Sequence, residues 1–287
     1  MNYTLALLAG MFVAIMITVN GELSEQYGLY WATVFIHLAG LCLITIIVLA
    51  KKERPFAVRY PWFFYLAGAI GVFNVVSNNF AFGRISVSAI LALGLLGQGV
   101  SGLIINHYGL WGMARRPFSR GNLVGLVLIF CGIAPMLTDF EILAVILSFA
   151  VGIGVILNVT FNARLANVTS VRISTFFNYV TGLSVALLVY FMFDIGETPL
   201  FGVTFSHTWY VYTGGFIGVA VITLSNVIVP KIGAFYLTLL MFIGQIFAGI
   251  LIDAMLDGAF SLRIFLGGAL VSAGLGANLL LDRKRAG

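Results

Sequence analysis

Two stretches that stand 147 residues apart share one unusual pattern: "LLGQGVSGLIIN" covers residues 95–106 and "FIGQIFAGILID" covers residues 242–253. Each stretch places a glutamine between small residues inside a long apolar run. A side-chain amide in hydrocarbon is costly unless it has hydrogen-bond partners. Its occurrence at two matching positions, Gln98 and Gln245, therefore indicates a common role and a duplicated chain.

The composition is that of an integral membrane protein. Of the 287 residues, 61% are hydrophobic and 9% are charged, and the mean hydropathy is +1.09, whereas a soluble domain carries roughly 25% charged residues. The net charge of +5 comes mostly from Lys and Arg in short segments between apolar runs, where cations set membrane orientation rather than bind nucleic acid. Cys42 and Cys131 lie inside apolar runs and are interpreted as packing residues.

Runs of about 20 apolar residues mark the membrane crossings. They predict an all-α integral membrane protein with ten transmembrane helices. The N-terminal run lacks the basic start and the cleavage site of a signal peptide, so it is interpreted as the first helix. The predicted spans are 3–24, 29–50, 61–82, 86–107, 121–137, 141–163, 172–193, 209–229, 232–253 and 263–281.

The positive charges predict the orientation of these helices. Alternating the ten spans leaves only Arg84 and Arg263 on one side, and the positive-inside rule makes the other side cytoplasmic. We therefore expect a multi-pass protein of the cytoplasmic (inner) membrane with both termini in the cytoplasm. The cations on the cytoplasmic side are Lys51, Lys52, Arg54, Arg59, Arg115, Arg116, Arg120, Arg164, Arg172, Lys231, Arg283, Lys284 and Arg285.

The repeat extends beyond the two glutamine segments. "YWATVFIHLAGL" at 30–41 matches "RISTFFNYVTGL" at 172–183, an offset of 142 that also pairs Asn20 with Asn162; after the first loop the offset becomes 147 and pairs Asn79 with Asn226. The predicted halves are residues 1–140 and 141–287. Because each half contains an odd number of helices, the two copies must be inverted, as in many secondary transporters.

Gln98 and Gln245 fall near the middle of their helices, where an inverted-repeat transporter keeps its substrate site. The alternative is that each amide only joins neighbouring helices. The flanking glycines predict a close backbone approach or a narrow cavity; they are Gly97 and Gly102 beside Gln98, and Gly244 and Gly249 beside Gln245. Further polar residues predict an amide-lined central cavity, with the same packing alternative: Asn74, Ser77, Asn78, Asn79, Asn158 and Asn162.

The chain resembles a known family in two segments. "GGFIGVAVITLSNVIVPKIGAFYLTLLMFIGQIFAGILID" at 214–253 and "NVTFNARLANVTSVRISTFFNYVTGL" at 158–183 are similar to signatures of the YdcZ-like branch of the drug/metabolite transporter superfamily. The first half departs from this pattern, with "GRIS" in place of the Pro-Lys turn. The resemblance implies a ten-helix, inverted-repeat carrier of small molecules, often an exporter. The site residues it implies are Asn20, Asn79, Gln98, Asn162, Asn226 and Gln245.

Ionisable residues near the membrane are further candidates. Glu22 is interpreted as the one carboxylate clearly associated with a helix, and we expect either a coupling site for protons or another ion, or a solvated helix end. His37 and its repeat partner Tyr179 are interpreted as substrate-site residues or as hydrogen-bonded packing partners. Asp253 ends its helix and is expected to be solvated.

No catalytic, metal-binding or cofactor motif is present in the sequence, and no loop is long enough for a nucleotide-binding domain. We therefore expect a transporter with a small-molecule substrate, a lipid bilayer around it, no cofactor and no nucleic-acid partner. A homo-oligomer is compatible with this class. Two alternatives stay open: an intramembrane enzyme that uses Glu22 and His37, and a receptor or scaffold that binds a ligand without transporting it.

Overall fold

The computed structural model describes most of the chain. The described residues are 2–56, 61–110, 127, 130–131, 141–194, 204–232, 234–256, 262, 265–270 and 272–273. Within these residues the secondary structure is helical, with no strand. The helices are α1 (Asn2–Tyr27), α2 (Leu29–Ala50), η1 (Trp62–Tyr65), α3 (Leu66–Ala81), α4 (Val87–Tyr108), α6 (Ile142–Val168), α7 (Val171–Phe193), η4 (Trp209–Thr213), α8 (Gly214–Ile232) and α9 (Ala234–Leu256).

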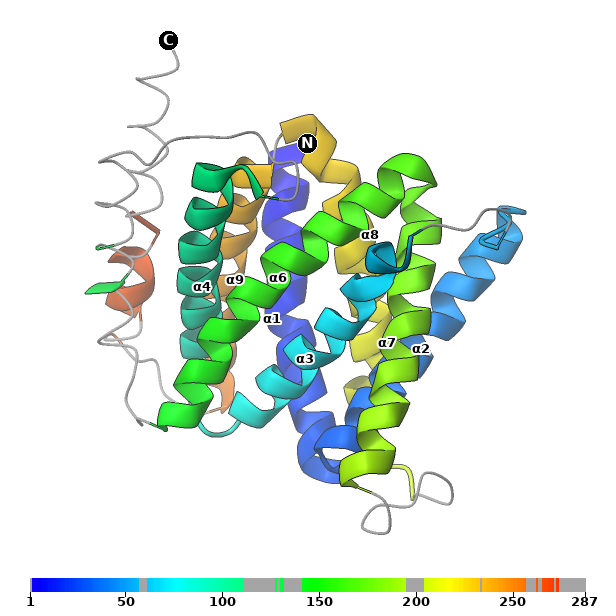
Figure 1. Cartoon of the computed structure of the whole chain (residues 1–287). Coiled ribbons are helices and arrows are strands. Elements are labelled where there is room, and N and C mark those ends of the chain that lie inside the picture. Colours follow the sequence, from blue (N-terminus) through cyan, green and yellow to red (C-terminus); the bar gives the residue numbers. More distant parts are fainter. Residues whose placement is uncertain are drawn as a thin grey trace.

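These helices form the bundle shown in Figure 1. Seven helical segments of the described chain are long and apolar enough to cross a membrane. Their outward surfaces are apolar as well: Ile46, Leu49 and Met192, for example, are more than half exposed. A helix that is apolar on all sides fits a bilayer, because lipid covers the side chains that the bundle does not.

Most predicted spans agree closely with the helices wherever both can be compared. α2 has the predicted bounds, α4 begins and ends one residue later than predicted, and α7 begins one residue earlier. α6 differs most at its end, because it continues five residues beyond the predicted residue 163, to Val168. α1 continues three residues beyond its predicted end, to Tyr27, because the chain turns only at Gly28, whose φ of 85° favours glycine. The predicted spans 121–137 and 263–281, and the predicted boundary after residue 140, lie largely outside the described residues.

The helices of the two halves are interleaved. α1 packs against α8 and α9, and α6 packs against α3 and α4; α2 contacts α7, and α4 contacts α9 (Figure 1). Glycines allow the tightest of these approaches. A Cβ at Gly97 of α4 would collide with the carbonyl group of Phe149 of α6, and a Cβ at Gly244 of α9 would collide with that of Leu7 of α1. The close approach predicted at the flanking glycines is therefore present at Gly97 and Gly244, and also at Gly249, where a Cβ would lie 2.9 Å from Leu91 Cδ1. It is absent at Gly102, where a Cβ meets nothing within 4 Å.

The charged residues lie at the two ends of the bundle. At the end where α1 begins, Glu53 forms an ion pair with Arg172 and accepts a hydrogen bond of 2.7 Å from Ser170 Oγ. At the opposite end, Arg84 Nε lies 3.3 Å from Glu141 Oε2. The described cations at the first end are Lys51, Lys52, Arg54, Arg164, Arg172 and Lys231.

Candidate functional site

Three asparagines form a hydrogen-bonded group between α6 and α7. Asn162 Nδ2 donates to Asn158 Oδ1 at 2.8 Å and to Asn178 Oδ1 at 3.1 Å, while Asn158 Nδ2 donates to Asn178 Oδ1 at 3.2 Å. Asn158 Nδ2 also lies 2.6 Å from the carbonyl oxygen of Ala67 in α3. This group therefore ties three helices together, as interhelical amides do in membrane proteins.

Asn178 was not among the predicted site residues. It directly precedes Tyr179 in the repeated segment, but the matching residue in the first half is Ile36, so the repeat carried no signal for it. The amide group is also supported from α7 by Ser174 Oγ, which donates to the Asn162 carbonyl oxygen at 2.7 Å.

Unlike Asn158, Asn162 and Asn178, the asparagines of α3 have side-chain atoms without hydrogen-bond partners among the described residues. Asn74 Oδ1, Asn78 Oδ1 and both side-chain polar atoms of Asn79 are buried and have no hydrogen-bond partner among the described residues. Asn20 Oδ1 and Asn226 Nδ2 share this property. A buried polar atom left without a partner costs about 1–3 kcal/mol. Water or a bound molecule must satisfy these atoms if the cost is to be avoided.

The unpaired amides do not gather in one cavity. Asn20 lies against Gly214 at the contact of α1 with α8, and Asn74 lies against Gly154 at the contact of α3 with α6. Asn79 lines a pocket at the end of α3. The unpaired amides thus lie at separate helix contacts around α1 and α3.

His37 and Tyr179 meet where α2 crosses α7. Their ring centroids are 6.0 Å apart, and the two side chains are almost fully buried. His37 Nδ1 donates to the Thr33 carbonyl oxygen at 2.8 Å, which assigns the proton of the neutral ring to Nδ1. Tyr179 Oη donates to the Gly215 carbonyl oxygen at 3.3 Å. Both residues therefore take part in helix packing.

Gln98 and Gln245 are half-buried. Neither side-chain amide forms a hydrogen bond with another residue in the part of the chain that the structure describes. The apolar cluster between α4 and α9 contains Leu95 and Phe242, three residues before each glutamine. Gln98 and Gln245 thus lie one turn from the contact between α4 and α9, and neither lines the pocket at the end of α3.

The carboxylates differ from their sequence interpretation. Glu22 is half-buried in α1 and lies close to the Tyr210 hydroxyl of η4. It is not the only helical carboxylate, because α1 also contains Glu25.

The expectation of a solvated Asp253 is wrong. The residue is 6% exposed, and its carboxylate accepts hydrogen bonds from the backbone nitrogens of Val87, at 2.8 Å, and Ser88, at 3.0 Å, as well as from the Ser88 hydroxyl. Asp253 of α9 therefore caps the N-terminus of α4, where a negative charge is favourable.

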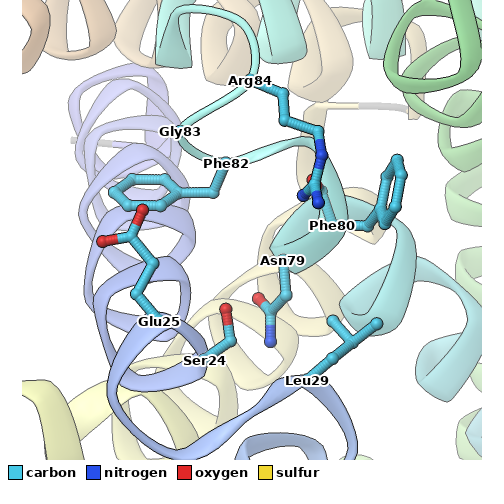
Figure 2. A pocket seen from close by; sticks show the side chains of 8 residues that line it. All are labelled: Ser24, Glu25, Leu29, Asn79, Phe80, Phe82, Gly83 and Arg84. Carbon is cyan, nitrogen blue, oxygen red and sulfur yellow. The ribbon is translucent and has the colours of Figure 1, made fainter.

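The pocket at the end of α3 has a volume of about 450 Å³, within the range of small-molecule sites. It lies where α1 and α3 end and α2 begins, and Figure 2 shows the side chains of Glu25, Asn79 and Arg84 on different sides of it. Of the predicted site residues, Asn79 alone lines it. The lining residues are Ser24, Glu25, Leu29, Asn79, Phe80, Phe82, Gly83 and Arg84.

An apolar helical bundle with buried amides defines the class of multi-pass membrane proteins. The family model described as "Putative inner membrane exporter, YdcZ" matches residues 1–135 and 143–277. The chain belongs to this YdcZ family, as the sequence resemblance implied, and is a multi-pass inner-membrane transporter.

A solved crystal structure has the same fold. It is titled only "Crystal structure of protein", and it aligns over 98% of this chain and 97% of its own length with a TM-score of 0.65 and 19% sequence identity. No curated protein matches the chain by sequence.

Proposed function

We propose that the chain is a secondary active transporter that moves a small polar or amphipathic molecule by alternating access. Its working units would be two inverted five-helix halves, residues 1–140 and 141–287, ten helices in all. In this mechanism one half rocks against the other and exposes a central site to each side of the membrane in turn.

One observation carries this proposal: contacts between the helices recur when the halves are exchanged. The contact of Gly97 with Phe149 corresponds to that of Gly244 with Leu7, because 244 − 97 = 147 and 149 − 7 = 142, the two offsets of the sequence repeat. A chance similarity in sequence would not place both partners of a contact at equivalent positions.

Two further contacts support the same exchange. His37 lies against Gly182 and Tyr179 lies against Gly40, and each pair is converted into the other by the offset of 142. The contact of Gly68 in α3 with α7 likewise corresponds to the contact of Gly215 in α8 with α2. Gly68 and Gly215 are equivalent positions of the repeat, separated by the offset of 147. Two such similar arrangements suit alternating access, since the inward-open and outward-open states of an inverted repeat can then have comparable energies.

The proposed substrate path follows the polar residues around α1 and α3, between α4 and α9, and beside α7. Its residues are those predicted from the sequence: Asn20, Asn74, Asn78, Asn79, Asn162, Asn226, Gln98, Gln245, His37 and Tyr179. The unpaired atoms of α3 support this path, because hydrogen-bonding groups that the protein leaves free are available to a substrate. Glu22 is the proposed residue for coupling to protons or another ion.

The charges support an orientation with both termini in the cytoplasm. The end of the bundle that carries Lys51, Lys52 and Arg172 would face the cytoplasm under the positive-inside rule. The pocket beside Asn79 would then open at the outer face of the inner membrane.

Reconstitution into proteoliposomes tests the function. The purified protein is screened by thermal shift against metabolites and organic ions, and each compound that raises the melting temperature is measured for counterflow. We expect counterflow that is lost in Gln98→Leu and Gln245→Leu variants of wild-type stability. A compound that binds without counterflow would favour a receptor, and one that is chemically converted would favour an enzyme.

A further inference from the structure

We propose that the pocket beside Asn79 binds a small organic cation whose charged group carries N–H donors, such as a primary ammonium or a guanidinium on an apolar body. The role of this pocket as the outer substrate site rests on the transport function proposed above, whereas the binding itself does not.

The balance of charge in the pocket favours a cation. Arg84 is compensated, because its guanidinium pairs with Glu141 at 3.3 Å, donates to the Phe80 carbonyl oxygen and lies 4.0 Å from the centroid of the Phe80 ring. Glu25 has no ion-pair partner among the described residues. The pocket therefore presents one uncompensated negative charge.

The neutral polar groups of the pocket add hydrogen-bond acceptors. Asn79 lines the pocket and is 5% exposed, and its acceptor Oδ1 and its donor Nδ2 are both buried without a partner among the described residues. Ser24 Oγ donates its proton to the Gly21 carbonyl oxygen at 2.8 Å, so its lone pairs remain to accept. Together with the Glu25 carboxylate, these oxygens suit a charged group that donates several N–H bonds.

The glycine turn after α3 leaves room for the carboxylate. Gly83 has a φ of 75°, and a Cβ there would lie 2.6 Å from Glu25 Oε1. A side chain at this position would therefore displace the carboxylate as well as strain the turn. The aromatic rings of Phe80 and Phe82 supply the apolar part of the lining.

The carboxylate of the pocket has no counterpart at the repeat-equivalent position. Glu25 corresponds to Asn167, and the neighbouring Glu22 corresponds to Arg164, through the offset of 142. The equivalent region at the opposite end therefore lacks the carboxylate, and a cation would be bound more strongly at the pocket described here.

Four related compounds test the proposal by calorimetry with the full-length protein in nanodiscs: benzylammonium, benzyltrimethylammonium, phenylalanine and phenylacetate. We expect benzylammonium to bind most tightly, because the quaternary cation has no N–H donor and the other two compounds carry a carboxylate. Tighter binding of phenylalanine or phenylacetate, or no binding of benzylammonium, would overturn the proposal.

Variants assign the binding to the pocket. Glu25→Gln should weaken benzylammonium binding about tenfold, the usual effect of losing a charged hydrogen-bond partner, and Glu25→Asp should restore part of it. Gln26→Lys changes the net charge equally at an exposed neighbour outside the pocket lining and should have less than about a twofold effect at physiological salt. Equal weakening by Glu25→Gln and Gln26→Lys, with melting temperatures unchanged, would overturn the site.

Flux measured separately keeps the two proposals distinct. Counterflow of other compounds but not of benzylammonium, in a protein that does not bind benzylammonium, would remove the cation site and leave the transport function. Glu25-dependent binding of benzylammonium without counterflow of any compound would remove the transport function and leave the cation site.

Discussion

His37 of α2 lies against Tyr179 of α7, with ring centroids 6.0 Å apart, and the two residues occupy equivalent positions of the sequence repeat. A residue that packs against its own equivalent marks the place where an approximate two-fold axis would pass between the halves. Leu95 and Phe242, which are separated by the second offset of 147, also belong to one apolar cluster between α4 and α9. The proposed axis would thus run between α2 and α7 and between α4 and α9.

The glycine contacts of α4 provide a matched pair of variants. Gly97→Ala should lower the stability by about 1–3 kcal/mol, because the added methyl group collides with the backbone of α6. Gly102→Ala should be neutral, since a Cβ at Gly102 meets nothing within 4 Å. Thermal unfolding in detergent measures both, and equal effects of the two variants would contradict the close contact.

The unpaired amide of Asn79 should lower the stability of the folded protein while it contributes to substrate binding. Asn79→Leu removes two buried polar atoms that have no partner among the described residues. It should therefore leave the free energy of unfolding unchanged or raise it by up to about 1–3 kcal/mol, and the melting temperature should not fall. Asn162→Leu should lower it, because Asn162 bonds Asn158 and Asn178. Transport should be lost in Asn79→Leu despite its stability. A strongly destabilised Asn79→Leu protein would return this residue to a packing role.

Asp253 should contribute to stability through α4. Asp253→Ala removes the acceptor of three hydrogen bonds and should destabilise the protein by about 1–2 kcal/mol. Ser88→Ala removes only one of these donors and should cost less. An Asp253→Ala protein as stable as Ser88→Ala would show that the cap is unimportant.

The ion pair between Glu53 and Arg172 predicts a pH dependence. Partial burial raises the pKa of Glu53, but hydrogen bonds from Ser170 and Arg172 and the charge of Arg172 outweigh it, so the pKa lies below its ordinary value of 4.5. A depressed pKa stabilises the folded protein above the ordinary value, and this contribution is lost as the pH falls through the folded-state pKa. Wild type should therefore unfold at a higher temperature than Glu53→Gln at pH 7, and the difference should shrink below pH 4.5. A difference that is independent of pH would exclude this origin.

Topology is tested with single cysteines in a protein without Cys42 and Cys131. Pro55→Cys should be protected from an impermeant thiol reagent in intact cells, and His207→Cys should react, because these positions lie at opposite ends of the bundle. The reverse pattern would invert the proposed orientation.

The sequence predicted most of what depends on local pattern and less of what depends on distant partners. Apolar runs located the helices, and the glycines beside Gln98 and Gln245 predicted close packing. The cap formed by Asp253 could not be predicted, because its partners are 165 and 166 residues away in the chain. Glu25 and Arg84 resemble solvated helix ends, and only the folded chain brings them to one pocket with Asn79. The substrate-site assignments of Gln98, Gln245 and the asparagines stay predictions.

Spin-label distances at repeat-equivalent positions test the central claim of alternating access most directly. One protein carries labels at Gln26 and Arg84, beside the pocket, and another at Val168 and Lys231, their equivalents at the opposite end; these positions are exposed. In the same lipid, each pair should show a short and a long distance, and the open fractions of the two ends should sum to about one because only one end opens at a time. Single unchanging distances at both ends, or open fractions that rise and fall together, would contradict the account.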